Sequence, residues 1–349
     1  MKAALLVRTN HIEVHDIPEP RPGPYQCVAR VLACGFCNGT DLKIMQGHWP
    51  GTDSMPLVLG HEAVAEVIFI GEKVRNLKQG DHVVQGRIES IPELGIGSAW
   101  GGFVEYVLVT DWQAMQADGE PIPFPFLMAQ QSIPKDLDIL DGVMLITLKE
   151  VASALQGFHM QTGKPMMIYG DGPVGLCMAM SARVMGASEV ILCGHHDERL
   201  ALAHELGVFL TINSAKQSVV DEIRQRYPKG LPLIVDAVGS ASIVQESLAI
   251  VAEEGHIGMY GFDDGQKATL DWHAAPPRWS FDYLVVPSLP RFIALHDPIV
   301  EWIKEGKIHP RRLVTHQGSI DKVPELAKAV ANRSAIKAVM VTDQKGSGT

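Results

Sequence analysis

The chain has 349 residues, of which 46% are hydrophobic and 20% are charged, and its formal net charge is −10. A chain of this length can bury a large core without disulfide bonds, and this composition excludes an intrinsically disordered protein. A nucleic-acid partner is not expected, because the chain is acidic and no run of Lys and Arg exceeds two residues.

Apolar runs and cysteines point to a cytoplasmic protein without a membrane partner. The apolar runs are shorter than the ~18 residues that a membrane span needs. Residues 1–8 are too short for the core of a signal peptide, and no cleavage site follows them. Five cysteines are an odd number at low density, which favours reduced thiols.

Residues 1–110 show short apolar or alternating runs separated by turns, with little helical periodicity. This pattern indicates a small β-barrel or β-sandwich. The strands expected here are 3–7, 12–14, 27–33, 63–70, 82–84 and 103–109.

From residue 146 onward, apolar strands alternate with helical segments. This alternation implies an α/β fold with a parallel sheet covered by helices on both faces. The expected strands are 166–169, 190–193, 209–212, 233–235, 257–260 and 338–341. The expected helices are a segment ending at 185, then 198–206, 219–227, 243–251 and 299–305.

A G-x-G-x-x-G motif lies between the first of these strands and its helix. Its glycines are Gly170, Gly172 and Gly175, and Pro173 and Val174 lie between the last two. In such a loop the glycines allow a tight turn, a close approach of the backbone to a pyrophosphate and close helix–strand packing. The free N–H groups of the helix N-terminus bind the phosphates. The motif therefore predicts a dinucleotide-binding site.

The end of the second strand bears on the choice between NAD and NADP. Gly194 stands where an acidic residue would bind the ribose 2′-hydroxyl of NAD. His195, His196 and Arg199 follow, and an arginine or a protonated histidine pairs well with a 2′-phosphate. These residues favour NADP. The alternative is that Asp197 takes the acidic role from a shifted loop.

Cys37, His61 and Glu150 are candidate zinc ligands, and Glu62 adjoins one of them. Cysteine, histidine and carboxylate side chains all bind zinc, and a catalytic zinc keeps an open position beside three protein ligands. The three residues lie far apart in the chain, so spacing alone does not bring them together. Their types alone favour a core cysteine and a surface His–Glu turn.

The chain resembles the zinc-dependent medium-chain alcohol/polyol dehydrogenases. The resemblance implies a GroES-like catalytic domain over 1–145 and 290–349, and a Rossmann domain over 146–289. It also implies that Cys37, His61 and Glu150 bind a catalytic zinc, with Glu62 as an alternative or transient ligand. The motifs that carry it, in the family's order, are 35–37 with 40–41, 60–62, 80–81, 101–106, 147–150 and 170–175.

Three departures from the family pattern have consequences. No cysteine lies between Gly86 and Gly101, so a structural zinc is not expected. The motif after Cys37 is one residue longer than usual, so Thr40 lies one position further from Cys37. The role expected for the Thr40 hydroxyl, beside the reacting oxygen, depends on that position. Lys43 stands where many relatives have a proton-relay histidine, and it is either a relay group, a substrate-binding group or a solvated lysine.

The resemblance predicts the oxidation of a secondary alcohol to a ketone, with a polyol, sugar or cyclitol as substrate. A carboxylate third ligand is typical of the polyol branch, although Glu150 could instead be a glutamate in the first turn of a helix. The alternatives are a zinc-free quinone or enoyl reductase and a non-catalytic dinucleotide-binding protein. We expect a homodimer or homotetramer. The proline-rich segment 121–134 is a moving element, an oligomer contact or a packed loop.

Overall fold

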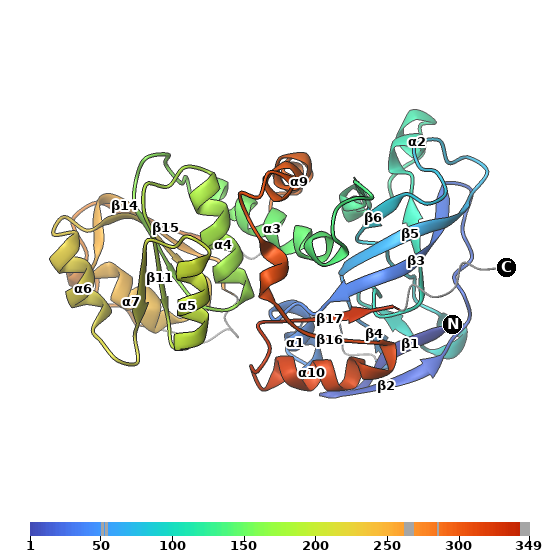
Figure 1. Cartoon of the computed structure of the whole chain (residues 1–349), viewed down its shortest axis with the longest axis horizontal. Coiled ribbons are helices and arrows are strands. Elements are labelled where there is room, and N and C mark those ends of the chain that lie inside the picture. The colour runs from blue at the N-terminus through green and yellow to red at the C-terminus, as the bar shows by residue number, and fades with distance from the viewer. Residues whose placement is uncertain (50–51, 53–54, 262–268, 285, 343–349) are drawn as a thin grey trace. The chain divides into compact units, whose positions relative to one another are not determined.

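The computed structural model describes residues 1–49, 52, 55–261, 269–284 and 286–342. The chain divides into two compact units, one of Met1–Ile146 with Pro310–Thr349 and one of Thr147–His309 (Figure 1). Residues 290–309 thus belong to the second unit, whereas the expected boundary lay at 289/290. Two contacts explain this: Arg183 Nη2 donates a hydrogen bond of 2.7 Å to the carbonyl of Lys307, and Lys149 Nζ lies 4.1 Å from the ring centre of Phe292.

The first unit is built on two sheets whose strands are mostly antiparallel. The larger sheet has the order β16 (Val314–Gly318), β17 (Lys337–Val341), β3 (Gln26–Gly35), β5 (Glu62–Ile70), β6 (His82–Val84) and β9 (Ser132–Ile133), and β8 (Tyr106–Thr110) also pairs with β3. The smaller sheet has the order β2 (His11–Asp16), β1 (Lys2–Arg8), β4 (Leu57–Val58) and β7 (Gly97–Ser98). The α-helices are α1 (Thr40–Met45), α2 (Trp112–Ala117) and α10 (Val323–Ala331).

Strand β3 is the centre of the larger sheet because it pairs with β5, β8 and β17. Its last residue, Gly35, is opposite Glu62 at the start of β5 and opposite Val339 of β17. This register brings the loop after β3 next to the beginning of β5. The pairing therefore joins segments that are distant in the sequence and carry the candidate metal ligands.

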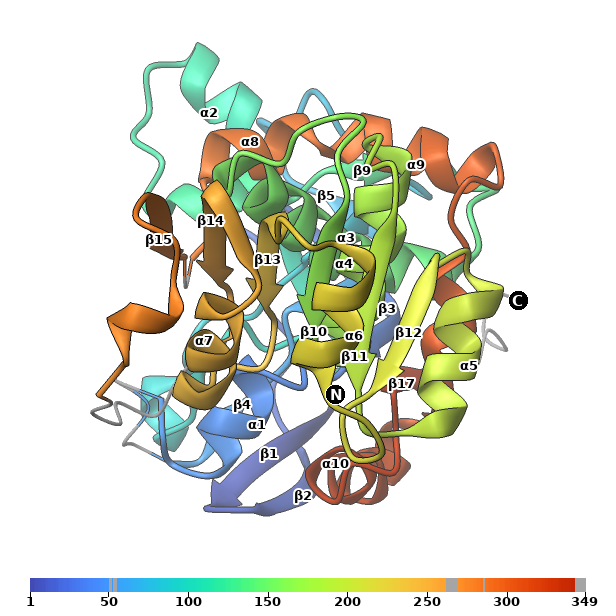
Figure 2. The same ribbon diagram turned by 90° about the vertical axis from the view of Figure 1, so that its left-hand side faces the viewer.

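The second unit contains a parallel sheet in the order β12 (Leu210–Asn213), β11 (Val190–Gly194), β10 (Met166–Tyr169), β13 (Leu231–Asp236), β14 (Val251–Met259) and β15 (Trp279–Tyr283) (Figure 2). The order reverses direction beside β10, as in a doubly wound Rossmann sheet. The helices are α4 (Pro173–Val184), α5 (Asp197–Glu205), α6 (Val219–Arg226), α7 (Ala241–Leu248), α8 (Leu289–Ala294) and α9 (His296–Lys304). The expected α/β fold class is confirmed.

Helix α3 (Ile139–Gly157) is the main element that the sequence pattern did not predict. Residues 141–149 are all buried, so the helix shows no alternation between an apolar and a polar face. Glu150 lies in the middle of this helix, and the alternative that placed it in a first helical turn is wrong. The expected helix 243–251 was too long, because β14 already begins at Val251. Among the described helices, none combines the length and apolar character needed to cross a membrane.

Candidate metal centre and dinucleotide-binding loop

Cys37, His61 and Glu62 form a cluster in the first unit. Cys37 follows β3, His61 immediately precedes β5 and Glu62 begins it, so the β3–β5 pairing brings the three together. One ligand atom from each lies within 4.8 Å of the others. Their exposed fractions are 9%, 4% and 0%, respectively. Sulfur, imidazole and carboxylate donors this close and this buried match the ligand types of zinc.

Asp41, on α1, supports two members of this cluster. Its side chain is fully buried, and Oδ2 accepts a hydrogen bond of 2.9 Å from the backbone N–H of Cys37. Its Oδ1 lies 3.7 Å from His61 Nδ1. A metal-bound histidine commonly has a carboxylate beside its other ring nitrogen. Asp41 belongs to the motif at 40–41, but its role is not predicted from the sequence.

His61 lies beside two acidic side chains, Asp41 and Glu62. Within the described residues, His61 Nδ1 and Asp41 Oδ1 are buried without a hydrogen-bond partner. Burial lowers the pKa of His61, but the neighbouring Asp41 carboxylate and Cys37 sulfur outweigh it and raise this pKa well above its usual range. The surroundings therefore favour a positive charge at this point. The residues present fit a bound zinc ion.

Glu62 also forms a buried ion pair with Lys337, at the start of β17. The exposed fractions are 0% for Glu62 and 1% for Lys337. The ion pair follows from the sheet order, because β3 lies between β5 and β17 and Gly35 has no side chain there. A Cβ on Gly35 would lie 2.6 Å from Glu62 Oε2 and 3.0 Å from Lys337 Cε. The sequence pattern held no signal for Lys337.

Thr40 and Lys43 lie on α1, half-buried and three residues apart, so they share one side of the helix. The backbone N–H of Thr40 points to Cys37 Sγ at 3.4 Å, which ties the start of α1 to the cluster. The ring of Trp100 lies beside His61, with 5.1 Å between ring centres. Trp100 therefore belongs to the surroundings of the cluster.

Glu150, the third predicted ligand, lies in the part of α3 that belongs to the second unit and is partly buried. Its neighbour Lys149 is fully buried, and burial lowers the pKa of Lys149 to about 7. The role of Glu150 as a ligand stays a prediction.

The glycine loop connects β10 to α4, as its motif predicts. Gly170 has a φ of +118°, a conformation that residues with a side chain rarely adopt. A Cβ on Gly175 would lie 1.8 Å from the carbonyl oxygen of Gly170, so the helix could not pack so close to the loop with any other residue. Gly172 is the N-cap of α4, Pro173 is its first residue and Val174 its second. The loop thus presents the N-terminus of α4 for phosphates.

Asp171, in the same loop, occupies the space at the end of β11. A Cβ on Gly194 would lie 2.4 Å from Asp171 Oδ2. This oxygen accepts hydrogen bonds of 2.8 Å each from the backbone N–H groups of His195 and His196. The absence of a side chain at Gly194 therefore has a packing reason, and a carboxylate is present there after all. Asp171 was missed in the sequence because it stands at a variable position of the motif.

The remaining predicted cofactor residues surround this carboxylate. His196 Nδ1 lies 3.0 Å from Asp171 Oδ2, and Arg199 Nη1 lies 4.0 Å from Asp171 Oδ1. His195 Nδ1 lies 2.9 Å from the hydroxyl of Ser214. Asp197, the alternative acidic residue, forms an ion pair of 2.5 Å with Lys216.

Comparisons with known proteins agree with both parts of this geometry. Residues 23–119 match the alcohol dehydrogenase GroES-like domain, and residues 173–277 match the zinc-binding dehydrogenase domain. An L-threonine 3-dehydrogenase from Streptomyces avermitilis is 30% identical over 279 residues, which cover 74% of this chain and 75% of that protein. The chain belongs to the zinc-type medium-chain alcohol/polyol dehydrogenase family.

Two other members of the family extend the match to nearly the whole chain. A sorbitol dehydrogenase from Bacillus subtilis is 25% identical over 362 residues, covering 98% of this chain and 97% of its own. The crystal structure of 2R,3R-butanediol dehydrogenase from Bacillus subtilis has the same fold, with a TM-score of 0.81, 22% identity and coverage of 98% and 99%. The predicted family is confirmed, and this medium-chain dehydrogenase is an oxidoreductase of the alcohol dehydrogenase type.

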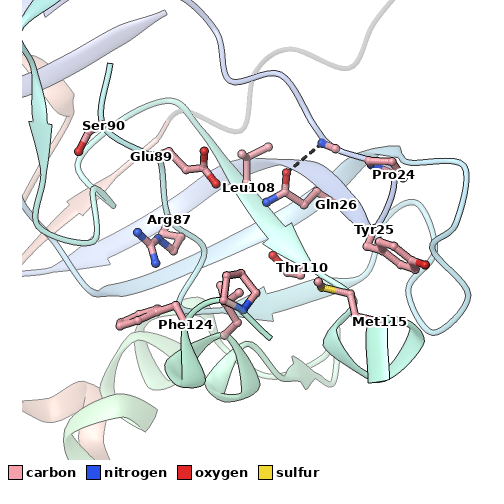
Figure 3. A pocket seen from close by; sticks show the side chains of 13 residues that line it. Pro24, Tyr25, Gln26, Arg87, Glu89, Ser90, Leu108, Thr110, Met115 and Phe124 are labelled. Carbon is pink, nitrogen blue, oxygen red and sulfur yellow. Dashed lines mark hydrogen bonds between the residues drawn. The ribbon is translucent and has the colours of Figure 1, made fainter. Parts of the chain in front are cut away.

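The proline-rich segment of this medium-chain dehydrogenase forms one wall of a pocket of about 360 Å³ in the first unit (Figure 3). Pro123, Phe124 and Leu127 contribute to it, and Arg87 lies 4.8 Å from the ring centre of Phe124. Leu127 is buried, and β9, at the end of the segment, pairs with β6. These contacts fit the packed-loop alternative for residues 121–134, and the moving element and the oligomer contact stay predictions.

This pocket is separate from the metal cluster. Gln26, at the first residue of β3, lines it, whereas Cys37 follows the last residue of the same strand. Ten residues at about 3.3 Å each place the two ends of β3 about 30 Å apart. The pocket therefore has no part in the chemistry of the cluster.

Proposed function

We propose that this protein is a zinc-dependent dehydrogenase that transfers a hydride between NAD(P) and a secondary alcohol of the polyol, sugar or cyclitol class. The buried cluster of Cys37, His61 and Glu62, with its ligand atoms within 4.8 Å of one another, carries the proposal. The names of the relatives support the substrate class, because sorbitol and butanediol each contain more than one hydroxyl group.

Cys37 and His61 would hold the zinc, with Glu150 as the third ligand implied by the family and Glu62 as the alternative ligand. A zinc ion bound there supplies Lewis acidity, which lowers the pKa of a substrate hydroxyl. Asp41 keeps the Cys37 backbone and the His61 ring in place. Lys337 balances the charge of Glu62, so that this carboxylate can stay buried beside the other ligands.

The proton of the substrate hydroxyl would leave along α1. The hydroxyl of Thr40 is the first acceptor, and Lys43, one turn further along the same side of the helix, receives the proton or binds a substrate oxygen. The contact between the Thr40 N–H and Cys37 Sγ supports this role, because it keeps Thr40 beside the cluster.

The second unit would bind the cofactor, with the pyrophosphate on the loop of Gly170, Gly172 and Gly175 and at the N-terminus of α4. NADP is the favoured cofactor, because the Asp171 carboxylate at the end of β11 is already bonded to the backbone N–H groups of His195 and His196, and the basic side chains of His196 and Arg199 lie beside it. We expect one catalytic zinc and no structural zinc, because the segment between Gly86 and Gly101 has no cysteine.

We also propose a homodimer or homotetramer. Strand β15 lies at the edge of the parallel sheet, and the exposed fractions of its Phe281 and Tyr283 are 41% and 45%. An edge strand with exposed aromatic side chains is a surface that another chain can extend or cover. Light scattering coupled to size-exclusion chromatography measures the mass directly, and a monomer at micromolar concentration contradicts this proposal.

The central test measures metal content and turnover on one sample. The protein is assayed with a panel of sugars, cyclitols and simple alcohols, with NAD and NADP, while zinc is determined by mass spectrometry. We expect one zinc per chain, and loss of both zinc and turnover in Cys37→Ser. Cys27→Ser, which changes a buried cysteine at the other end of β3, is the matched control. Undiminished turnover without bound metal overturns the role of zinc and leaves the cofactor site standing.

A further inference from the structure

We propose that Asp171 positions His196 so that its imidazole, rather than the guanidinium of Arg199, recognises the 2′-phosphate of NADP. The inference rests on the proposed function, since it takes the glycine loop to be the dinucleotide site. It adds a positioning residue from the glycine loop and assigns the recognition of the phosphate to one side chain.

The first observation is how firmly Asp171 is fixed. The residue is 6% exposed, and Oδ2 accepts the backbone N–H groups of both His195 and His196. Burial raises the pKa of Asp171, but these hydrogen bonds and that of the His196 ring outweigh it and lower the pKa below its usual value. A fixed negative charge is therefore bonded to the backbone of the turn between β11 and α5.

The second observation is the orientation of His196. Its Nδ1 lies 3.0 Å and 3.1 Å from the two carboxylate oxygens of Asp171. A carboxylate on one ring nitrogen fixes the orientation of the ring. The side chain of His196 is nevertheless 46% exposed, so Nε2 is left for a ligand. An imidazolium ring can donate one N–H to a carboxylate and the other to a phosphate group, which suits a ligand at the end of β11.

The third observation concerns Arg199, another basic residue that the sequence offers for a 2′-phosphate. Its side chain is only 12% exposed, and Nη1 lies 4.0 Å from Asp171 Oδ1. The guanidinium therefore balances the buried carboxylate from within the fold. His196 is the more exposed of the two basic side chains beside Asp171.

The experiment measures cofactor binding without turnover, by titration calorimetry of NADP⁺ and NAD⁺ into the full chain. In wild type we expect NADP⁺ to bind more tightly than NAD⁺. His196→Ala, at an exposed position, should weaken NADP⁺ binding about tenfold and NAD⁺ binding less than about twofold. Asp171→Asn should also lower the ratio of NADP⁺ affinity to NAD⁺ affinity, by about fivefold, because the amide keeps the shape of the carboxylate but not its charge.

His204→Ala is the matched control, since His204 is an exposed histidine near the C-terminal end of α5. It should leave both affinities unchanged. Equal weakening of both cofactors by Asp171→Asn overturns the inference, because it would mean that Asp171 only holds the turn. The inference is also overturned if His196→Ala leaves the ratio of NADP⁺ affinity to NAD⁺ affinity unchanged, or if wild type binds NAD⁺ more tightly than NADP⁺. Failure of wild type to bind either dinucleotide instead refutes the cofactor part of the proposed function.

Discussion

Buried acids have different surroundings in the two units. In the first unit, Asp41 has a buried oxygen that finds no hydrogen-bond partner in the described part of the chain, and it lies 3.7 Å from a histidine nitrogen in the same condition. In the second unit, Asp171 accepts two backbone N–H groups and the ring of His196. Burying a carboxylate is costly unless a positive charge lies nearby, so the charge of Asp41 suits a histidine that binds a metal ion. A satisfied carboxylate instead fixes the conformation of a loop.

The largest effect is expected for Lys337→Met, which leaves the buried Glu62 without its counter-charge. Removing one partner of a buried pair costs about 3–5 kcal/mol, so the metal-free protein should show a much lower thermal midpoint. The double variant Lys337→Met with Glu62→Gln should recover most of this loss. Lys322→Met, which breaks an exposed pair with Glu325, serves as the control and should cost well under about 1 kcal/mol. Equal midpoints for the two single variants would refute the prediction.

The second prediction tests the support that Asp41 gives to the metal ligands. Asp41→Asn should weaken zinc binding by about 10–100-fold, because the charge beside His61 is lost while the shape is kept. Competition with a chromogenic chelator measures the affinity. Asp321→Asn removes an exposed carboxylate of the same unit and should leave the zinc affinity unchanged. Zinc affinity that is the same in both variants would mean that Asp41 has only a structural role.

The third prediction concerns the space that Asp171 fills. Gly194→Ala places a Cβ 2.4 Å from Asp171 Oδ2 and should displace the carboxylate, at a cost of about 1–3 kcal/mol. Gly172→Ala is the contrast within the same site, because its Cβ meets nothing within 4 Å and its φ is −79°. It should keep the stability of the protein while weakening binding of either dinucleotide. Thermal unfolding and calorimetry separate the two effects, and an unaltered midpoint in Gly194→Ala counts against the packing argument.

The smallest effect is a pH dependence of stability. The pKa of Asp171 is lowered in the folded state, so the ionised carboxylate stabilises the fold above the unfolded value near 3.8. This contribution is lost as the pH falls through the lower folded pKa. The difference in thermal midpoint between wild type and Asp171→Asn should therefore be constant from pH 7 to about pH 5 and shrink below about pH 4. A difference in thermal midpoint that grows toward acid pH would contradict this prediction.

Local patterns predicted most of the regular elements. Strands such as β6 and β10 lie where the apolar runs placed them, because burial of alternating or continuous apolar residues is a property of neighbouring positions. Helix α3 escaped prediction because residues 141–149 are buried on every side, which removes the periodic signal. For the same reason nothing in the local pattern spoke against the alternative that put Glu150 in a first helical turn.

Residue types and short motifs were enough to indicate a dehydrogenase, a glycine loop and a set of candidate ligands. They could not show that Cys37 and His61 meet, because their approach depends on the register that sets Gly35 opposite Glu62. Nor could they reveal Asp41, Lys337 and Asp171 as partners of these sites. Ion pairs and hydrogen bonds between distant positions arise only when strands pair and helices pack, and they leave no periodic trace along the chain.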